Sequence, residues 1–79
     1  MKHVMCDLET LGTTADAVIL SIGAVKFDLE TGEISDEGFY RSVSVDSNLE
    51  RGRRISEDTL IWWFKQPAAA QAVFHEAKE

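Results

Sequence analysis

The sequence predicts one small α/β domain in which three β-strands come first and helices follow. Two observations predict this class. From Lys2 to Val45 the apolar residues alternate with polar ones or form short β-branched runs, which is typical of strands. After a polar stretch at 46–54, the apolar residues recur at helical spacing and helix formers dominate. No repeat or linker divides the chain, so residues 1–79 form a single domain.

The strand region reads as an antiparallel meander. The first strand is expected over Lys2–Leu8, and because both of its faces are apolar we expect it to be buried and central. The second is expected over Ala17–Asp28, where Gly23 indicates a bulge or a close approach. The third is expected over about Ile34–Val45. Between the last two, the Thr31-Gly32 pair supplies the positive φ that a hairpin turn needs.

Two helices are expected after the strands. Ser56 is a good N-cap, and acidic residues in the first turn complement the helix dipole, so the first helix is predicted over Glu57–Gln66. Pro67 ends that helix and suits the first turn of a second helix, predicted over residues 67–79.

The paired tryptophans cannot both face inward, because neighbours on a helix are about 100° apart. Trp63 falls on the apolar stripe of the first helix and is expected in the core, whereas Trp62 falls at its margin and is expected to be partly exposed. Trp62 is therefore the one that is available to stack on a nucleic-acid base or to pack against another part of the protein.

Composition limits the classes of function. The 79 residues are 44% hydrophobic and 28% charged, an ordinary globular balance. The net charge of −6 repels polyanions and gives no support to non-specific nucleic-acid binding. The single cysteine, Cys6, excludes an internal disulfide, fits a reducing compartment and is expected to be a buried small hydrophobe. With no signal peptide or membrane span, the expected location is the cytoplasm.

Asp7 and Glu9 are the candidate chemical residues. Side chains two apart on a strand point to the same side, with Cα atoms about 6.5 Å apart. One interpretation is that the strand simply ends in solvent there, as most charged residues do. The other is a hard-metal site, in which Mg²⁺ or Mn²⁺ offsets the repulsion between the two carboxylates.

Two segments of the chain resemble a known family. The stretch Asp7-Leu8-Glu9-Thr10, followed by a Gly/Thr loop and the strand AVILSIGAVKFD, resembles the first motif of the DEDD (DnaQ-like) 3′–5′ exonucleases, which have a ribonuclease H-like fold. The stretch GRRISEDTLIWWFKQ resembles a segment of a small bacterial and phage exoribonuclease-like branch of that superfamily. The resemblance covers nearly the whole chain and implies the N-terminal half of a ribonuclease H-like fold.

The resemblance also implies a reaction. Two divalent metals, Mg²⁺ or Mn²⁺, would help hydrolyse nucleotides from the 3′ end of RNA or single-stranded DNA. Asp7 would bind both metals, and Glu9 would bind one of them and orient the attacking water. Thr10, Leu11 and Gly12 would line the pocket for the 3′-terminal nucleotide.

The chain departs from the family pattern in one large respect. The family's second and third acidic motifs belong to a C-terminal half that is expected to begin about where this chain ends, so only two of four metal ligands are present. This favours little or no activity for the chain alone. The alternative to a nuclease is therefore an inactive remnant that serves as a dimerising scaffold or interaction module.

Two further expectations concern partners. Arg53 and Arg54, in the only basic cluster, are either a solvated loop or phosphate contacts ahead of the helix. In a ribonuclease H-like sheet of order 3-2-1-4-5, the first strand here would lack its fourth-strand neighbour. Its free edge would favour pairing with another chain, so we expect a homodimer or oligomer through the first strand.

Overall fold

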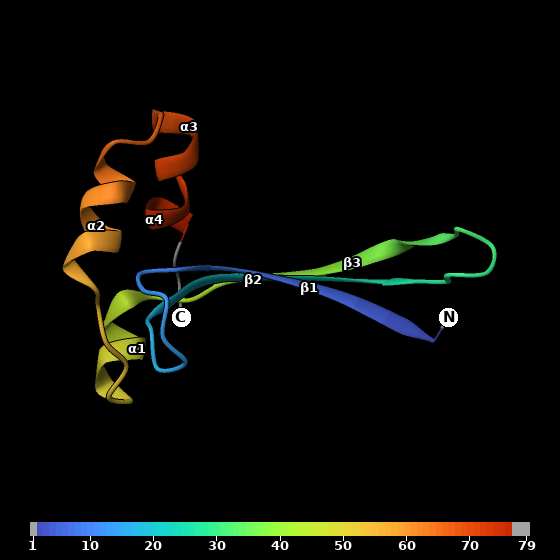
Figure 1. Cartoon of the computed structure of the whole chain (residues 1–79), viewed down its shortest axis with the longest axis horizontal. Helices are drawn as coiled ribbons and strands as arrows, with labels where there is room; N and C mark the ends of the chain where they lie inside the picture. Colours follow the sequence, from blue (N-terminus) through green and yellow to red (C-terminus); the bar gives the residue numbers. More distant parts are fainter. Residues whose placement is uncertain (1, 77–79) are drawn as a thin grey trace.

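A computed structural model of the chain describes residues 2–76. It contains a three-stranded antiparallel sheet followed by helices, as the sequence predicts. The elements are β1 (His3–Thr10), β2 (Ile19–Phe27), β3 (Ile34–Ser42), α1 (Val45–Glu50), α2 (Glu57–Phe64), α3 (Ala68–Gln71) and α4 (Val73–Glu76). Figure 1 shows the helices gathered at one end of a long sheet whose other end carries only strands.

The sheet has the order β1-β2-β3, so β1 lies at an edge and not at the centre of the described sheet. The expectation of a buried first strand is wrong for these residues: Val4 and Met5 are more than half exposed, and the Cys6 thiol is exposed too. In the described residues β1 pairs with one neighbouring strand, and its residues from His3 to Leu8 are exposed.

The meander is joined as expected at its second turn. Gly32 has φ +74°, the left-handed conformation that the turn between β2 and β3 requires. Asp28 stabilises this turn because its carboxylate accepts the Glu30 N–H at 2.8 Å. Gly23 does not form a bulge; the ladder shifts register instead between Glu9 and Thr10 and between Val25 and Phe27.

The helices differ from the prediction in number and length. Ser56 caps α2, accepting the Thr59 N–H at 3.4 Å, but α2 ends at Phe64. The second predicted helix is divided into two short ones, α3 and α4, and its predicted part at 77–79 lies outside the described residues.

Helix α1 was not predicted, because its residues read as the end of a strand and a polar loop. Ser44 caps it by accepting the Ser47 N–H at 3.0 Å, and Gly52, at φ +79°, follows it. The buried Asn48 amide joins α1 to the start of β2: its Oδ1 accepts the Ile19 N–H and its Nδ2 donates to the Ile19 carbonyl, both at 2.8 Å. The polar stretch is therefore part of the structural framework.

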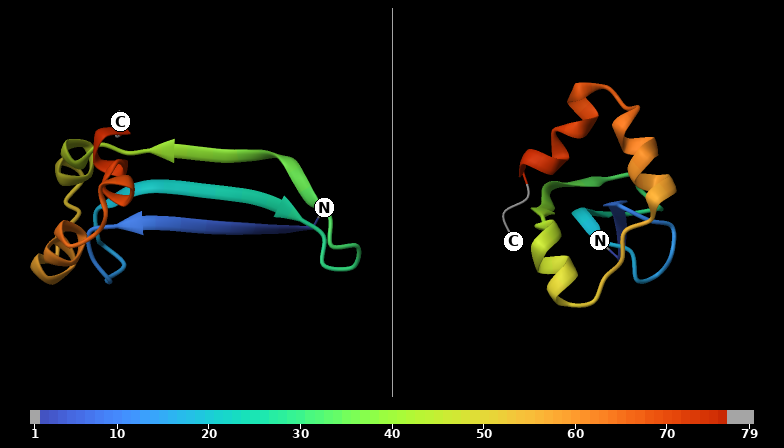
Figure 2. Two further views of the ribbon diagram at one scale, coloured as in Figure 1. Left: turned by 90° about the horizontal axis from the view of Figure 1, so that it is seen from above. Right: turned by 90° about the vertical axis from the view of Figure 1, so that its left-hand side faces the viewer.

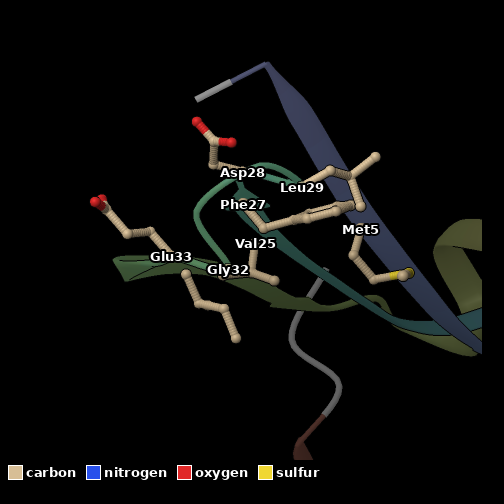
Figure 3. A pocket seen from close by; sticks show the side chains of 8 residues that line it. Met5, Val25, Phe27, Asp28, Leu29, Gly32 and Glu33 are labelled. Carbon is tan, nitrogen blue, oxygen red and sulfur yellow. The ribbon is translucent and has the colours of Figure 1, made fainter.

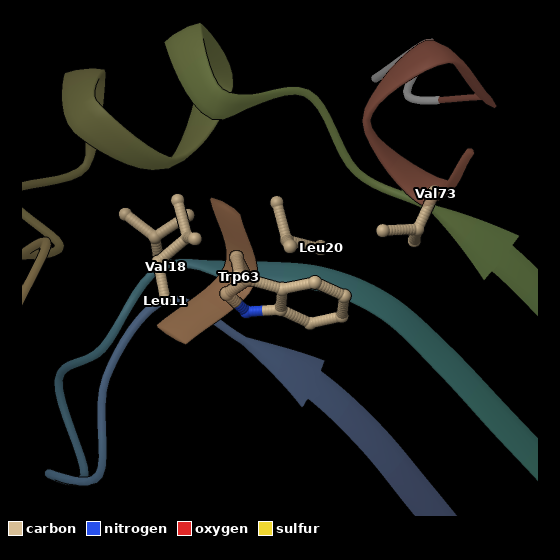
Figure 4. Close-up of a cluster of buried hydrophobic side chains, with 5 residues drawn as sticks. All are labelled: Leu11, Val18, Leu20, Trp63 and Val73. Atoms are coloured by element: carbon tan, nitrogen blue, oxygen red, sulfur yellow. The ribbon is translucent and has the colours of Figure 1, made fainter. Parts of the chain in front are cut away.

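The hydrophobic core lies entirely at the helical end. Figure 4 shows its members, which are Leu11, Val18, Leu20, Trp63 and Val73. Helices α2, α3 and α4 lie on one side of this end of the sheet and α1 lies on the other (Figures 1 and 2). Burial of these side chains is the main force that seats α2 and α4 on the sheet.

The opposite end of the sheet has no helix over either face (Figure 2). A hollow of about 350 Å³ there, the hairpin hollow, is lined by apolar side chains of all three strands and of the turn, among them Met5, Phe27, Leu29 and Ile34 (Figure 3). Leu29 is 70% exposed and Ile34 is 67% exposed. Among the side chains that line this hollow, Figure 3 shows two carboxylates, those of Asp28 and Glu33 near the turn. The rest of the lining is apolar, so the hollow has few groups that take part in catalysis or bind a metal.

Candidate metal and nucleic-acid site

The end of β1 carries the two acidic side chains on one face of the sheet. Asp7 pairs with Gly23 of β2, and Gly23 pairs with Tyr40 of β3. Glu9, two residues further along β1, pairs with Ser21. Residues directly opposite each other in a ladder share a face, and these residues line one hollow together with residues of α2, α3 and α4, so they lie on the side that these helices cover.

A hollow of about 460 Å³, the carboxylate hollow, lies between this face and the helices. Asp7 and Glu9 both line it, together with Tyr40, Trp62 and Glu76. Because Gly23 has no side chain, the floor of the hollow stays open: a Cβ there would meet only the Asp7 carbonyl oxygen at 3.9 Å and Tyr40 Cδ1 at 4.0 Å.

Glu76 of α4 is the acidic residue that the sequence did not reveal. Its Oε2 accepts a hydrogen bond from the Tyr40 hydroxyl at 2.9 Å and lies 3.5 Å from Ser42 Oγ. These contacts attach α4 to β3 at the rim of the carboxylate hollow. Nothing in the sequence pairs residue 76 with residue 40, since the contact depends on how the short helices fold back over the sheet.

The tryptophans take the places that the helical pattern predicts. Trp63 is 4% exposed and its Nε1 donates to the Thr10 carbonyl at 2.9 Å, which fastens α2 to the end of β1. Trp62 is 53% exposed and meets Trp63 edge to face, with ring centroids 5.2 Å apart. Trp62 lines the carboxylate hollow and also a neighbouring hollow of about 410 Å³ that contains Glu9, Thr10 and Gly12.

The loop after β1 is rigidly held. The Thr10 hydroxyl donates to the Gly12 carbonyl at 2.7 Å. The Leu11 N–H donates to the Val18 carbonyl at 2.9 Å, and the Leu11 carbonyl accepts the Ser56 N–H at 2.8 Å. The Leu11 side chain lies in the core and is 1% exposed. That Leu11 lines a nucleotide pocket stays a prediction. Gly12 is needed for packing, because a Cβ there would lie 3.0 Å from Ala17 Cβ.

The two arginines lie apart from the carboxylates. Arg53 is half-buried; its Nε donates to the Ala17 carbonyl at 2.8 Å and its Nη2 to the Ala15 carbonyl at 2.9 Å, so its guanidinium braces the loop. Arg54 is exposed and lines a different hollow, which it shares with Gly12 and Asp16. Of the two, Arg54 presents its side chain to solvent.

Asp16, in the same loop, has a pKa below its ordinary value. The main cause is the hydrogen bond from the Thr14 hydroxyl at 2.6 Å, and the charges of Arg54 and Arg53 lower the pKa further. The loop's electrostatics therefore favour the ionised carboxylate of Asp16, which lines a different hollow from Asp7 and Glu9.

The two carboxylates are donors of the kind that a divalent ion requires. Carboxylate oxygens are the ligands that Mg²⁺ and Mn²⁺ prefer, and Mg²⁺ is commonly held by one or two carboxylates with water and substrate phosphate. Asp7 and Glu9 meet that description. Within residues 2–76, however, no three His, Cys, Asp or Glu side chains come close enough to hold an ion together. The chemistry of the two donors fits, and any further ligands have to come from solvent or substrate.

Repulsion between the two carboxylates does not by itself require a cation. Charges about 6.5 Å apart in water repel by only about 0.6 kcal/mol. What distinguishes this strand end is the common face of the two carboxylates beside an exposed aromatic ring. No helix among residues 2–76 is long and apolar enough to cross a membrane.

Comparison with known proteins gives one result. The model of the 3′–5′ exoribonuclease Rv2179c-like domain family matches residues 2–79. No curated protein and no solved structure matches the chain. The match extends from the first strand, with Asp7 and Glu9, through the tryptophan helix and beyond, so it includes both segments of the candidate site. The chain belongs to the 3′–5′ exoribonuclease Rv2179c-like domain family.

Proposed function

We propose that this chain is a metal-dependent 3′–5′ exonuclease domain with the N-terminal half of a ribonuclease H-like fold. One observation carries the proposal: Asp7 and Glu9 line a single hollow beside the exposed ring of Trp62, in a chain of an exoribonuclease family. The substrate is the 3′ end of RNA or single-stranded DNA. The required cofactor is Mg²⁺ or Mn²⁺, held by Asp7 and Glu9.

The roles follow from the chemistry of each side chain. When bound, divalent ions supply Lewis-acid stabilisation of the phosphate and a more acidic water. Asp7 and Glu9 supply the anionic oxygens that attract the ions and orient the water. Trp62 supplies a face on which a terminal base stacks, which is worth about 1–3 kcal/mol per base. Trp63 positions this platform through its hydrogen bond to Thr10.

The loop residues divide into two groups. Thr10 and Gly12 border the hollow next to Glu9 and are proposed to contact the terminal nucleotide. Arg54 is proposed to contact a phosphate further along the strand. Arg53, whose guanidinium already bonds two carbonyls, is proposed to hold the loop in place.

The first test is metal binding. Titration calorimetry with Mn²⁺ is expected to give heat for the natural chain and at least about 100-fold weaker binding for Asp7→Asn, because removal of a ligand exceeds the usual 10–100-fold cost of removing a residue that orients one. The matched control is Asp36→Asn, which removes an exposed carboxylate from β3. Equal Mn²⁺ binding by the two variants would contradict the proposed site.

The second test is nucleotide release. RNA and single-stranded DNA labelled at the 3′ end are incubated with the natural chain and Mn²⁺, and released mononucleotides are separated by chromatography. Release that Asp7→Asn abolishes and Asp36→Asn does not would support the enzyme. Because residues 2–76 contain no three-residue metal cluster, we expect release to be slow.

A second function is favoured by the free edge of β1. The alternative is a catalytically inactive remnant that acts as a dimerising scaffold, with self-association through this strand. Mn²⁺ binding without nucleotide release, together with a stable dimer in light scattering, would support the scaffold over the enzyme.

A further inference from the structure

We propose that the Asp58 carboxylate accepts a hydrogen bond from the 2′-hydroxyl of the terminal ribose, so that the site prefers the 3′ end of RNA to that of single-stranded DNA. This inference rests on the proposed function and deepens it, because it names a side chain that tells the two substrates apart. It concerns the hollow of about 410 Å³ that adjoins the carboxylate hollow at Glu9 and Trp62, which we call the threonine hollow.

The threonine hollow lies between the end of β1 and the first turns of α2. The indole rings of both tryptophans line it, and the hydrogen bond from Trp63 Nε1 to the Thr10 carbonyl, at 2.9 Å, joins its two walls. Its polar lining consists of Thr10, Thr13, Thr59 and the carboxylates of Glu9 and Asp58. Its volume falls within the range of pockets that hold small molecules, and an aromatic wall with a few polar groups is typical of them.

The charge of this lining decides which part of a nucleotide it accepts. Among residues 2–76, no lysine, arginine or histidine lines the threonine hollow, so a phosphate group there would face two carboxylates without a cation and would be repelled. Carboxylates and threonine hydroxyls both accept hydrogen bonds from hydroxyl groups. The threonine hollow therefore suits the sugar of a nucleotide, whereas the carboxylate hollow is the proposed place of the metal and the phosphate.

Asp58 lies one turn before Trp62 on the same face of α2. Residues four apart on a helix are neighbours, with Cβ atoms about 5–6 Å apart. Both side chains line the threonine hollow, and both are exposed. A base that stacks on the Trp62 ring therefore carries its ribose next to the turn that holds Asp58.

The two carboxylates of the threonine hollow have different surroundings. Glu9 lines the carboxylate hollow as well and is proposed to hold the metal. Asp58 lines the threonine hollow but not the carboxylate hollow. Asp58 is not the N-cap of α2 either, because the Ser56 hydroxyl accepts the Thr59 N–H at 3.4 Å. Of the two, Asp58 is therefore the carboxylate that is available to the sugar.

The 2′-hydroxyl is the group by which a protein tells RNA from DNA at a given sugar. A carboxylate is a suitable partner for it, as in dinucleotide-binding folds, where an acidic side chain bonds the ribose 2′-hydroxyl. Hydrogen bonds to charged groups contribute more than those between neutral groups. Because Asp58 is exposed and is solvated when no hydroxyl is present, we expect the low end of their range, which is about a tenfold preference for ribose.

Nucleotide binding tests this inference apart from catalysis. The ligands are adenosine 5′-monophosphate (AMP) and its 2′-deoxy and 3′-deoxy forms, which contain no linkage for an exonuclease to cleave. NMR titration of the isotope-labelled chain in Mg²⁺ follows the indole N–H of Trp62, which the spectrum of Trp62→Phe assigns. AMP and the 3′-deoxy form, which both keep the 2′-hydroxyl, are expected to bind about tenfold more tightly than the 2′-deoxy form.

Two variants assign the preference to one side chain. Asp58→Ala is expected to weaken the binding of AMP and of the 3′-deoxy form about tenfold, and to leave the binding of the 2′-deoxy form within about twofold. The matched control is Glu57→Ala, which removes the neighbouring carboxylate of the same turn. Glu57 lies about 100° away round the helix and does not line the threonine hollow, so this variant is expected to keep the tenfold preference. Circular dichroism verifies that each variant is folded.

The outcomes separate this inference from the proposed function. Equal binding of AMP and its 2′-deoxy form at Trp62 would overturn the role of Asp58 and leave the proposed exonuclease standing. A preference for ribose that Asp58→Ala retains would also overturn that role, because another group would then bond the 2′-hydroxyl. If none of the three nucleotides shifted the Trp62 signal, the pocket for the terminal nucleotide would be wrong, and both proposals would fall.

Discussion

The two ends of the sheet differ in what surrounds the same three strands. At the helical end, Leu20 is fully buried and Trp63 is 4% exposed, whereas at the hairpin end Leu29 is 70% exposed and no helix is near. The candidate site belongs to the helical end. The residues that bury the core, Trp63 above all, are also the residues that place Trp62 beside Glu9. Folding energy and site geometry therefore depend on the same contacts.

This contrast has a consequence for stability. A chain of 79 residues is expected to have about 4–12 kcal/mol of unfolding free energy. Because the described core consists of so few side chains at one end, most of that free energy should depend on the helical end, and the hairpin end should open more readily.

The largest predicted effect is the loss of Trp63. Trp63→Ala is expected to cost about 3–5 kcal/mol, because it empties the core and removes the hydrogen bond to Thr10. Urea unfolding followed by circular dichroism measures it. Trp62→Ala is the control and is expected to cost about 1 kcal/mol or less, since its ring is 53% exposed. Equal costs would show that the core is not where the structure places it.

The second prediction concerns the buried amide that joins α1 to β2. Asn48→Ala removes the partners of both backbone groups of Ile19 and is expected to cost about 1–3 kcal/mol in urea unfolding. Ser47→Ala, at the neighbouring position on the same helix, is expected to stay within about 0.5 kcal/mol of the natural chain. If Asn48→Ala cost less unfolding free energy than Ser47→Ala, the contact between α1 and β2 would not stabilise the fold.

The third prediction tests the hairpin end directly. Leu29→Ser is expected to change the unfolding free energy by no more than about 0.5 kcal/mol, because the side chain is already exposed. Hydrogen exchange should show the amides of residues 29–36 exchanging well before those of Leu11 and Val18, which bond within the helical end. Slow exchange at residues 29–36 would mean that another chain covers this end.

The smallest predicted effect is the pH response of Asp16. Its pKa lies below the ordinary 3.8, so its ionised form stabilises the fold above that pH, and the stabilisation is lost as pH falls through the lowered pKa. Thr14→Val removes the main cause and is expected to move the pKa of Asp16 back toward 3.8, as NMR titration of the carboxyl measures. The accompanying loss of stability at neutral pH should be small, because the group is exposed. A pKa unaffected by Thr14→Val would assign the shift to the backbone hydrogen bond and the arginines.

Much of the local structure could be predicted from residue patterns. Alternation located all three strands, Ser56 marked the start of α2, and helical spacing separated buried Trp63 from exposed Trp62. These features depend on contacts within a few residues, for which sequence spacing is sufficient. The common side of Asp7 and Glu9 belongs to the same class, since strand alternation alone requires it.

What the sequence determined by itself is therefore the meander, the capped tryptophan helix and the acidic pair on one side of a strand. Only the tertiary structure decided which residues meet across the chain: Glu76 with Tyr40, Asn48 with Ile19, and Arg53 with the loop of Ala17. It also decided that Val4, Met5 and Cys6 are exposed, although their composition predicts burial. The physical reason is that burial depends on the presence of a neighbouring layer, and an apolar strand without one remains at the surface.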